Sequence, residues 1–90
     1  MLIVGIHLEG GSQYEHITRV RWKMIASPNT YDGEASVSEV VGWIKASAHI
    51  VWSDGSPVAS VYVNNRNGRE FIESRADSTR SNNLLTQPRF

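Results

Sequence analysis

The sequence predicts an α+β fold in which a small antiparallel sheet of about five strands carries one helix on one face. Two observations lead to this class. Short runs of alternating apolar and polar residues are separated by turn dipeptides such as Asp54-Gly55 and Asn67-Gly68, which is typical of strands joined by hairpins. One further stretch has apolar residues at helical spacing. The expected order of elements is β-β-α-β-β-β.

Two strands are predicted before the helix. Every even-numbered residue from 2 to 8 is apolar. This period of two is that of a strand with one buried side. In residues 16–25 apolar side chains again largely alternate with polar ones. The glycines at positions 10 and 11 mark a turn between the two runs, so a hairpin is expected. Residues 26–36 contain Pro28, Asn29 and Gly33 and are expected to form a loop.

The helix is predicted from a capping box and an apolar stripe. Ser36 and Glu39 have the spacing at which the serine hydroxyl accepts a hydrogen bond from the Glu39 amide while the carboxylate accepts one from the Ser36 amide. The helix is expected over residues 37–47. The apolar residues that follow the period of one helix face are Val37, Val40, Val41, Ile44 and Ala48.

Three strands are predicted after the helix, within residues 49–54, 58–64 and 69–76. The second has Ala59 and Val63 on one side, and the third is expected to place Phe71 on the side opposite Ile72. The residues expected in the core are Val4, Ile6, Val20, Trp22, Val40, Val41, Ile44, Val61, Val63 and Ile72.

Composition limits the classes of function. The length predicts a single domain over residues 1–90, and the formal net charge is zero, so any polyanion would be recognised by a local patch. The chain has no cysteine, which excludes disulfides, thiolate metal sites and cysteine nucleophiles. We expect no cofactor, metal site or catalytic residues. We also expect a cytoplasmic location and no membrane partner, since the apolar start of the chain is too short to span a bilayer.

The strongest chemical feature is a cationic stripe formed by Arg19, Arg21 and Lys23. On a strand these alternate residues point to one face, roughly 6.5–7 Å apart. That spacing suits successive phosphates of a nucleic acid or one polyanionic ligand. The competing interpretation is an exposed sheet face whose cations pair with acidic residues of neighbouring strands.

Four aromatic residues complete the set of candidates. Trp52 and Tyr62 are candidate ligand-binding residues, because an exposed ring offers a stacking surface to a base. Trp43 and Phe71 are candidate interface residues, because aromatic side chains are enriched in interface hot spots. Whether Trp43 and Trp52 are buried stays open at this point.

The last segment, residues 77–90, begins as a polar run and then carries Leu84, Leu85 and a final Phe90. Its apolar residues predict an ordered segment that packs back on the body of the domain, since each buried leucine or phenylalanine contributes about 1.5–3 kcal/mol. Asn82 or Asn83 is expected to hydrogen-bond the backbone at a turn.

Three stretches together, "HITRVRW", "VSEVVGWI" and "FIESRADSTRSNNLLTQPRF", carry a resemblance. From about residue 16 to the end, the chain resembles a family of small bacterial and phage proteins catalogued as a domain of unknown function. Its members have an I-T-x-V-R-W strand and an A-D-x-x-x-x-x-N-L-L-x-x-P-x-aromatic ending. Ser78 and Gln87 depart from the glycine and leucine usual there. The resemblance implies an α+β fold, a cytoplasmic location and a phage or prophage origin, and it implies no catalytic residues.

Three classes of function therefore stay open. The first is a non-enzymatic binding or protein-interaction module, with a protein partner or a second copy in a homodimer. The second is a nucleotide or nucleic-acid binder that uses Arg19, Arg21 and Lys23, for example a phage protein that binds a ligand of host defence. The third, a hydrolase, has the least support, because no nucleophile motif such as G-x-S-x-G is present.

Overall fold

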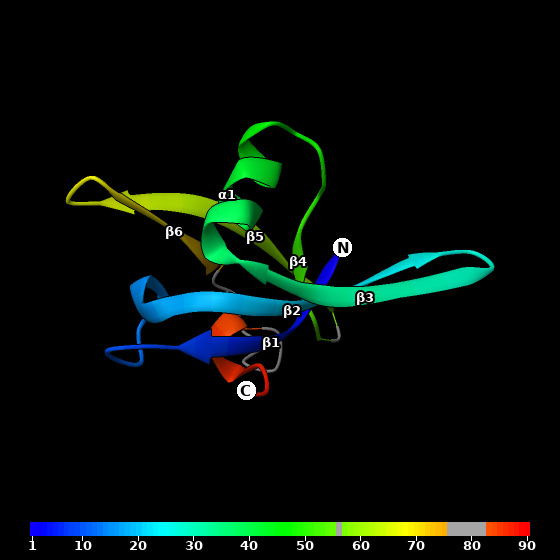
Figure 1. Ribbon diagram of the computed structural model, residues 1–90, viewed down its shortest axis with the longest axis horizontal. Helices are drawn as coiled ribbons and strands as arrows, with labels where there is room; N and C mark the ends of the chain where they lie inside the picture. Colours follow the sequence, from blue (N-terminus) through cyan, green and yellow to red (C-terminus); the bar gives the residue numbers. More distant parts are fainter. Residues whose placement is uncertain (56, 76–82) are drawn as a thin grey trace.

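The computed structural model describes residues 1–55, 57–75 and 83–90. These residues form six strands, one α-helix and two 3-10 helices (Figure 1): β1 (Leu2–Leu8), η1 (Tyr14–His16), β2 (Ile17–Ala26), β3 (Asn29–Ser36), α1 (Val37–Lys45), β4 (Trp52–Ser53), β5 (Ala59–Arg66), β6 (Arg69–Ser74) and η3 (Leu84–Thr86).

The predicted α+β class is confirmed, with differences in the sheet. The six strands lie in the order β3-β2-β1-β4-β5-β6, one strand more than expected. Most neighbours are antiparallel, but β1 and β4 are parallel, so the sheet is mixed. After β1 the chain runs through β2, β3 and α1 and then places β4 along the edge of β1 opposite to β2. This crossover connection allows β4 to run parallel to β1.

The prediction of a loop over residues 26–36 is wrong, because residues 29–36 form β3. The turn is confined to Ser27-Pro28, and each residue of β3 then has a partner on β2. Strand propensity alone argues against Asp32 and Gly33 in such a place. Here Asp32 lies opposite Lys23 on β2, so its charge faces one of opposite sign across the strands.

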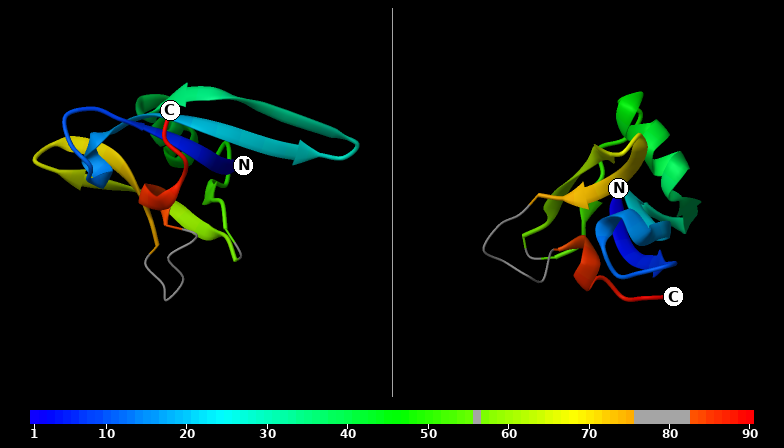
Figure 2. Two further views of the ribbon diagram at one scale, coloured as in Figure 1. Left: turned by 90° about the horizontal axis from the view of Figure 1, so that it is seen from below. Right: turned by 90° about the vertical axis from the view of Figure 1, so that its left-hand side faces the viewer.

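The helix begins as predicted, with the capping box of Ser36 and Glu39 present in both directions. The Ser36 hydroxyl accepts from the Glu39 amide at 3.2 Å. The helix ends at Lys45, two residues earlier than expected, with Ala46 as its C-cap. It lies against one side of the sheet (Figure 2) and contacts β2, β3, β5 and β6.

The core contains six of the ten predicted residues as buried side chains, while Val4, Trp22, Ile44 and Val63 are only partly buried. Val4 is displaced because the register of β1 against β2 shifts between Ile3 and Gly5. The shift turns Ile3 inward, where it is 0% exposed. The other buried apolar residues outside the ten are Ile17, Ala35, Val37, Val51, Ala59, Phe71 and Leu84, of which Leu84 was expected to pack on the body with the end of the chain.

The C-terminal residues 83–90 pack on the body of the domain. Leu84 is 0% exposed and belongs to the core cluster, against which Leu85 also packs. The Asn83 side chain accepts a hydrogen bond from the Leu85 amide at 2.8 Å. The expectation for Asn82, like the rest of residues 77–82, lies outside the described residues.

The C-terminal residues 83–90 also supply hydrogen-bond partners along one edge of β1. The short strand β4 occupies that edge at Leu2 and Ile3. Further along, the Ile6 amide donates to the Pro88 oxygen at 2.9 Å, and the Phe90 amide donates to the Ile6 oxygen at 3.1 Å. The end of the chain therefore satisfies backbone groups that β4 is too short to reach.

One part of the sheet leaves the body. The pairing of β1 with β2 ends at Leu2 and Lys23, whereas β2 and β3 continue to pair up to Ala26 and Asn29. Residues 24–31 therefore form a two-stranded ribbon, called the arm below, which projects from the rest of the molecule (Figures 1 and 2). The arm contributes to an elongated shape of 42 × 29 × 23 Å.

Candidate functional site

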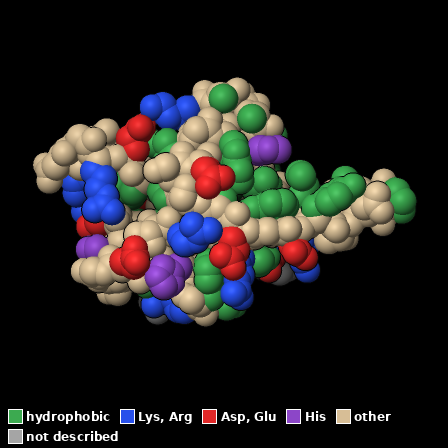
Figure 3. All heavy atoms as spheres, viewed as in Figure 1, with side chains coloured by type: hydrophobic (Ala, Val, Ile, Leu, Met, Phe, Trp, Pro, Cys, Tyr) green, Lys and Arg blue, Asp and Glu red, His purple; other side chains and the backbone are tan. Residues whose placement is uncertain are grey.

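The strand β2 holds Arg19, Arg21 and Lys23 exposed on one face of the sheet. Their neighbour on β3 is Glu34, whose carboxylate oxygens lie 3.7 Å from Arg19 and 3.4 Å from Arg21. Figure 3 shows basic and acidic side chains alternating over this part of the surface. The stripe is therefore a mixed-charge face, in which two of the three cations share one carboxylate.

The same face receives the end of the chain. The Arg21 guanidinium lies over the Phe90 ring, 4.3 Å from its centroid, at a distance typical of a cation–π contact. His7 Nδ1–H donates to the main-chain oxygen of Phe90, and the two rings lie 5.8 Å apart. Arg21 therefore stays in place through contacts on two sides, which reduces its freedom to reach a ligand.

A shallow hollow of about 350 Å³ lies beside these cations. Across it Lys23 faces Asp32 as cross-strand partner. The residues that line the hollow are Val4, Arg21, Trp22, Lys23, Asp32, Gly33 and Glu34. Because two carboxylates line it alongside two cations, a polyanion placed there would meet repulsion as well as attraction.

Trp52 lies on the same face as the stripe. Leu2 of β1 is the register partner of both Lys23 and Trp52, so these two side chains share a face two strands apart, roughly 9–10 Å. Trp52 is half-buried, which leaves part of the ring to a ligand. The structure thus places Trp52 on the same face as Lys23, two strands away.

Tyr62 lies further away, on β5. Its side chain is 40% exposed, and its hydroxyl donates to Glu73 Oε2 at 2.7 Å. This hydrogen bond to Glu73 and the charge of the same carboxylate, with some burial, raise the pKa of Tyr62 above its usual range. Its hydroxyl is thus engaged by its neighbour on β6.

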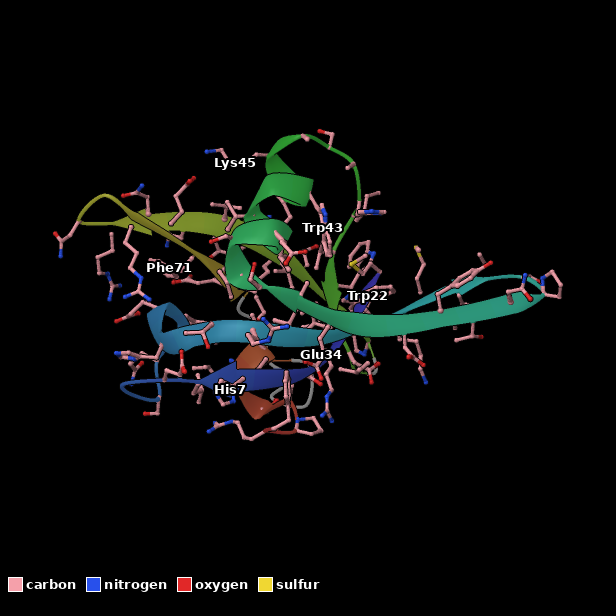
Figure 4. All side chains as sticks on the ribbon, viewed as in Figure 1. His7, Trp22, Glu34, Trp43, Lys45 and Phe71 are labelled. Atoms are coloured by element: carbon pink, nitrogen blue, oxygen red, sulfur yellow. The ribbon has the colours of Figure 1, made fainter. Side chains whose placement is uncertain are left out.

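The two interface candidates have different surroundings. Trp43 is half-buried and packs against the core, and it meets His49 edge to face with ring centroids 5.5 Å apart. Figure 4 shows Trp43 and Trp22 on the side of α1 that faces the arm. Phe71 is only 1% exposed, so it does not offer its ring to a partner in this structure.

Phe71 lies instead at the wall of a cleft of about 490 Å³ between α1, β2 and the turn of β5 and β6. The two carboxylates at its rim are already paired, Glu15 with Arg66 at 3.3 Å and Glu70 with Lys45 at 2.9 Å. The residues lining it are Glu15, Ile17, Thr18, Val37, Ser38, Val41, Gly68, Arg69, Glu70 and Phe71. No sequence pattern indicates this cleft, because its residues come from several elements.

The arm is the surface that sequence reasoning missed. Ile25 is 70% exposed and Tyr31 is 49% exposed, one on each face of the arm, since Ile25 lies opposite Thr30. Met24 lies opposite Tyr31, so the two share one face. The signal was present in the sequence, since the run MIASPNTY between Lys23 and Asp32 carries no charge.

Trp22 sits at the base of the arm. Its ring lies against Gly33, where an added Cβ would be 2.8 Å from Trp22 Cζ2. Among the described residues no hydrogen-bond partner reaches its buried Nε1 atom. Glycine at position 33 therefore lets the indole lie flat on β3 and support the arm from one side.

These features define a small α+β protein with a mixed-charge sheet face and a projecting apolar arm. A family model described as "Protein of unknown function (DUF3892)" matches residues 3–88, and the chain belongs to this family. No curated protein and no solved structure matches it. In the described part of the chain, every helix falls short of the length and apolar character needed to cross a membrane.

Proposed function

We propose that this chain is a protein-interaction module that engages its partner through the arm. The observation that carries the proposal is the exposure of Ile25 and Tyr31 on a ribbon that projects from the body. A two-stranded ribbon alone in water is marginally stable. A partner that covers these side chains would supply the burial that the arm lacks in the single chain.

The geometry of the arm also suits contact with another protein. Its backbone is fixed at its base by Trp22 on Gly33, so it is presented in one direction. Tyrosine contributes a large contact area at a small cost in side-chain entropy. These properties favour recognition of another protein surface over recognition of a small molecule, which requires a concave site.

The polyanion-binding alternative has less support from the geometry. Glu34 neutralises part of the charge of Arg19 and Arg21, and a phosphate would have to compete with it. If the stripe nevertheless bound nucleic acid, affinity would fall steeply with salt. A triple change of Arg19, Arg21 and Lys23 to serine would abolish that binding.

The test is site-specific photo-crosslinking with a benzoylphenylalanine at position 31 or at position 62, in cells that express the chain. Tyr31 and Tyr62 are both exposed tyrosines on strands, 49% and 40% exposed, and only Tyr31 belongs to the arm. We expect protein adducts from position 31 and few from position 62. Equal yields from the two positions, or none from position 31, would refute the proposal.

A further inference from the structure

The outer edge of β3 is open. β3 is the last strand at one end of the sheet, and among the described residues no strand pairs with its far side. Alternate residues of an edge strand direct their N–H and C=O groups outward. At the other end of the sheet β6 is contacted by η1, where Tyr14 Oη lies 3.2 Å from Ser74 Oγ. The two ends of the sheet are therefore unlike.

The part of this edge that lies in the arm lacks the devices that keep edge strands apart. β3 pairs with β2 over eight consecutive residues without a register shift, so no bulge twists its edge away. Its outer three residues, 29–31, carry no charge, whereas Asp32 and Glu34 follow closer to the body, and the chain places no lysine in β3. Edge strands that stay single are usually protected by bulges or charged residues, lysine above all. The edge is therefore suited to pairing with another strand.

We propose that the occupant of this edge is a second copy of the chain, paired β3 to β3 in antiparallel orientation about a two-fold axis at Tyr31. The proposal rests on the proposed function and names the partner of the arm. Self-pairing of this kind is isologous, so one patch serves both copies and the assembly closes as a dimer. The two sheets then join into one continuous sheet.

Charge selects the register. With the axis at Tyr31, Asp32 lies opposite the partner's Thr30, and Glu34 lies opposite the partner's uncharged Pro28, in the turn of the arm. An axis at Asp32 would set two aspartates opposite each other, and an axis at Gly33 would set Asp32 opposite the partner's Glu34. Like charges directly opposite each other destabilise a strand pair. The registers with longer overlap are thus disfavoured, and the arms pair at their uncharged part.

The selected register also places apolar side chains together. Met24 lies opposite Tyr31 within one copy, so Met24, Tyr31 and the same two residues of the partner form one row across the joined sheet. Aromatic pairs across strands stabilise a sheet. On the other face Asp32 keeps Lys23 as its neighbour within its own copy. The exposed Tyr31 ring thus gains a partner, and no like charges face each other across the joined edge.

Because the chain contains no cysteine, a single introduced cysteine can form a disulfide only with the same residue of a second copy. In the proposed register two Tyr31→Cys side chains lie directly opposite each other, with Cβ atoms about 4.5–5.5 Å apart, close to the span of a disulfide. Thr30→Cys is the matched control, because its two copies are offset by roughly 7 Å along the strands. We expect rapid oxidation of the Tyr31→Cys chain to a covalent dimer and at least tenfold slower oxidation of the Thr30→Cys chain.

Native mass spectrometry of the unmodified chain completes the test, with an expected mass of twice 10.1 kDa. Tyr31→Lys places two positive charges at the axis and should give the monomer mass while circular dichroism stays unchanged. A monomeric parent, or equal oxidation at positions 30 and 31, would overturn the dimer. If position 31 then crosslinks to a different protein in cells, the dimer fails but the interaction module stands. If it crosslinks to nothing, both fail.

Discussion

Replacing Leu84 with alanine should destabilise the domain strongly, although the residue lies six positions from the end of the chain. Its side chain is 0% exposed and belongs to the core cluster. Its amide donates to the Ser74 hydroxyl at 2.9 Å, which fixes η3 against β6. The substitution removes packed apolar atoms and leaves a cavity that the surrounding strands fill only in part.

The expected loss of stability follows from this burial. A buried leucine replaced by alanine costs about 3 kcal/mol, with a range of about 2–5 kcal/mol. For a domain of this size each kcal/mol lowers Tm by roughly 4–8 °C, so a fall of roughly 12–24 °C is expected. That is a large part of the roughly 5–15 kcal/mol by which a domain is stable.

The assay is thermal unfolding followed by circular dichroism, with Leu85→Ala as the control. Leu85 is only half-buried, so its replacement should lower Tm by less than half as much. A change of less than roughly 2 °C for Leu84→Ala would refute the docking of residues 83–90 on the core. Deletion of residues 84–90 should cost at least as much as Leu84→Ala, because it also removes the backbone bonds to β1.

Three other predictions concern Gly33, Gly42 and Tyr62. Gly33→Ala should lower stability by about 1–3 kcal/mol, because its Cβ would lie 2.8 Å from Trp22 Cζ2; urea unfolding measures the loss, and an unchanged midpoint would contradict the packing of the indole. Gly42→Ala in α1 should instead raise stability by about 0.5–1 kcal/mol, since its Cβ meets nothing within 4 Å; a loss in the same unfolding experiment would show a hidden contact. The raised pKa of Tyr62 means that tyrosinate forms less readily in the folded chain than in the unfolded chain. The stability from its bond to Glu73 is therefore fully present below about pH 10, the ordinary pKa of tyrosine. This stability is lost as the pH rises through the raised pKa of the folded chain. Titration at alkaline pH, followed by tyrosinate absorbance, should show this group ionising later than ordinary tyrosine, and Glu73→Gln should move it back; an unchanged titration in Glu73→Gln would contradict the assigned cause.

Local patterns in the sequence predicted the elements whose signals are local. The capping box of Ser36 and Glu39 gave the start of the helix, because both partners lie within one turn. The Asn67-Gly68 turn between β5 and β6 was equally readable, since both residues adopt the positive φ angles of 55° and 78° that such a turn requires.

The misses arise where distant residues override local preference. Residues 29–36 read as a loop because Asp32 and Gly33 are poor strand formers, and it is Lys23 and Trp22 on β2 that accommodate them. The same error hid Glu34, the carboxylate that pairs with the predicted cationic stripe. The alternating positions of the cations on β2 could be predicted from the sequence. The acidic residues of β3 beside them could not, because β3 itself was not predicted.

The burial of Phe71 could not be predicted from the sequence either. Alternation in β6 sets Phe71 and Ile72 on opposite sides, which predicts that one of them is exposed. Both are buried, at 1% and 0% exposure; Phe71 lies at the wall of the cleft that α1 also lines, with the Arg66 guanidinium 5.8 Å from its ring centroid. A strand that is covered on both sides loses the simple pattern of inward and outward residues.

Amide hydrogen exchange tests most directly whether the arm is held in place by pairing with another chain. Exchange is compared between the unmodified chain and Tyr31→Lys, for the arm and for the turn of β5 and β6, which is a hairpin end outside the arm. We predict that the arm amides are protected in the unmodified chain and exchange faster in Tyr31→Lys, while the turn of β5 and β6 is unchanged. Equally fast exchange of the arm in both chains would contradict the account.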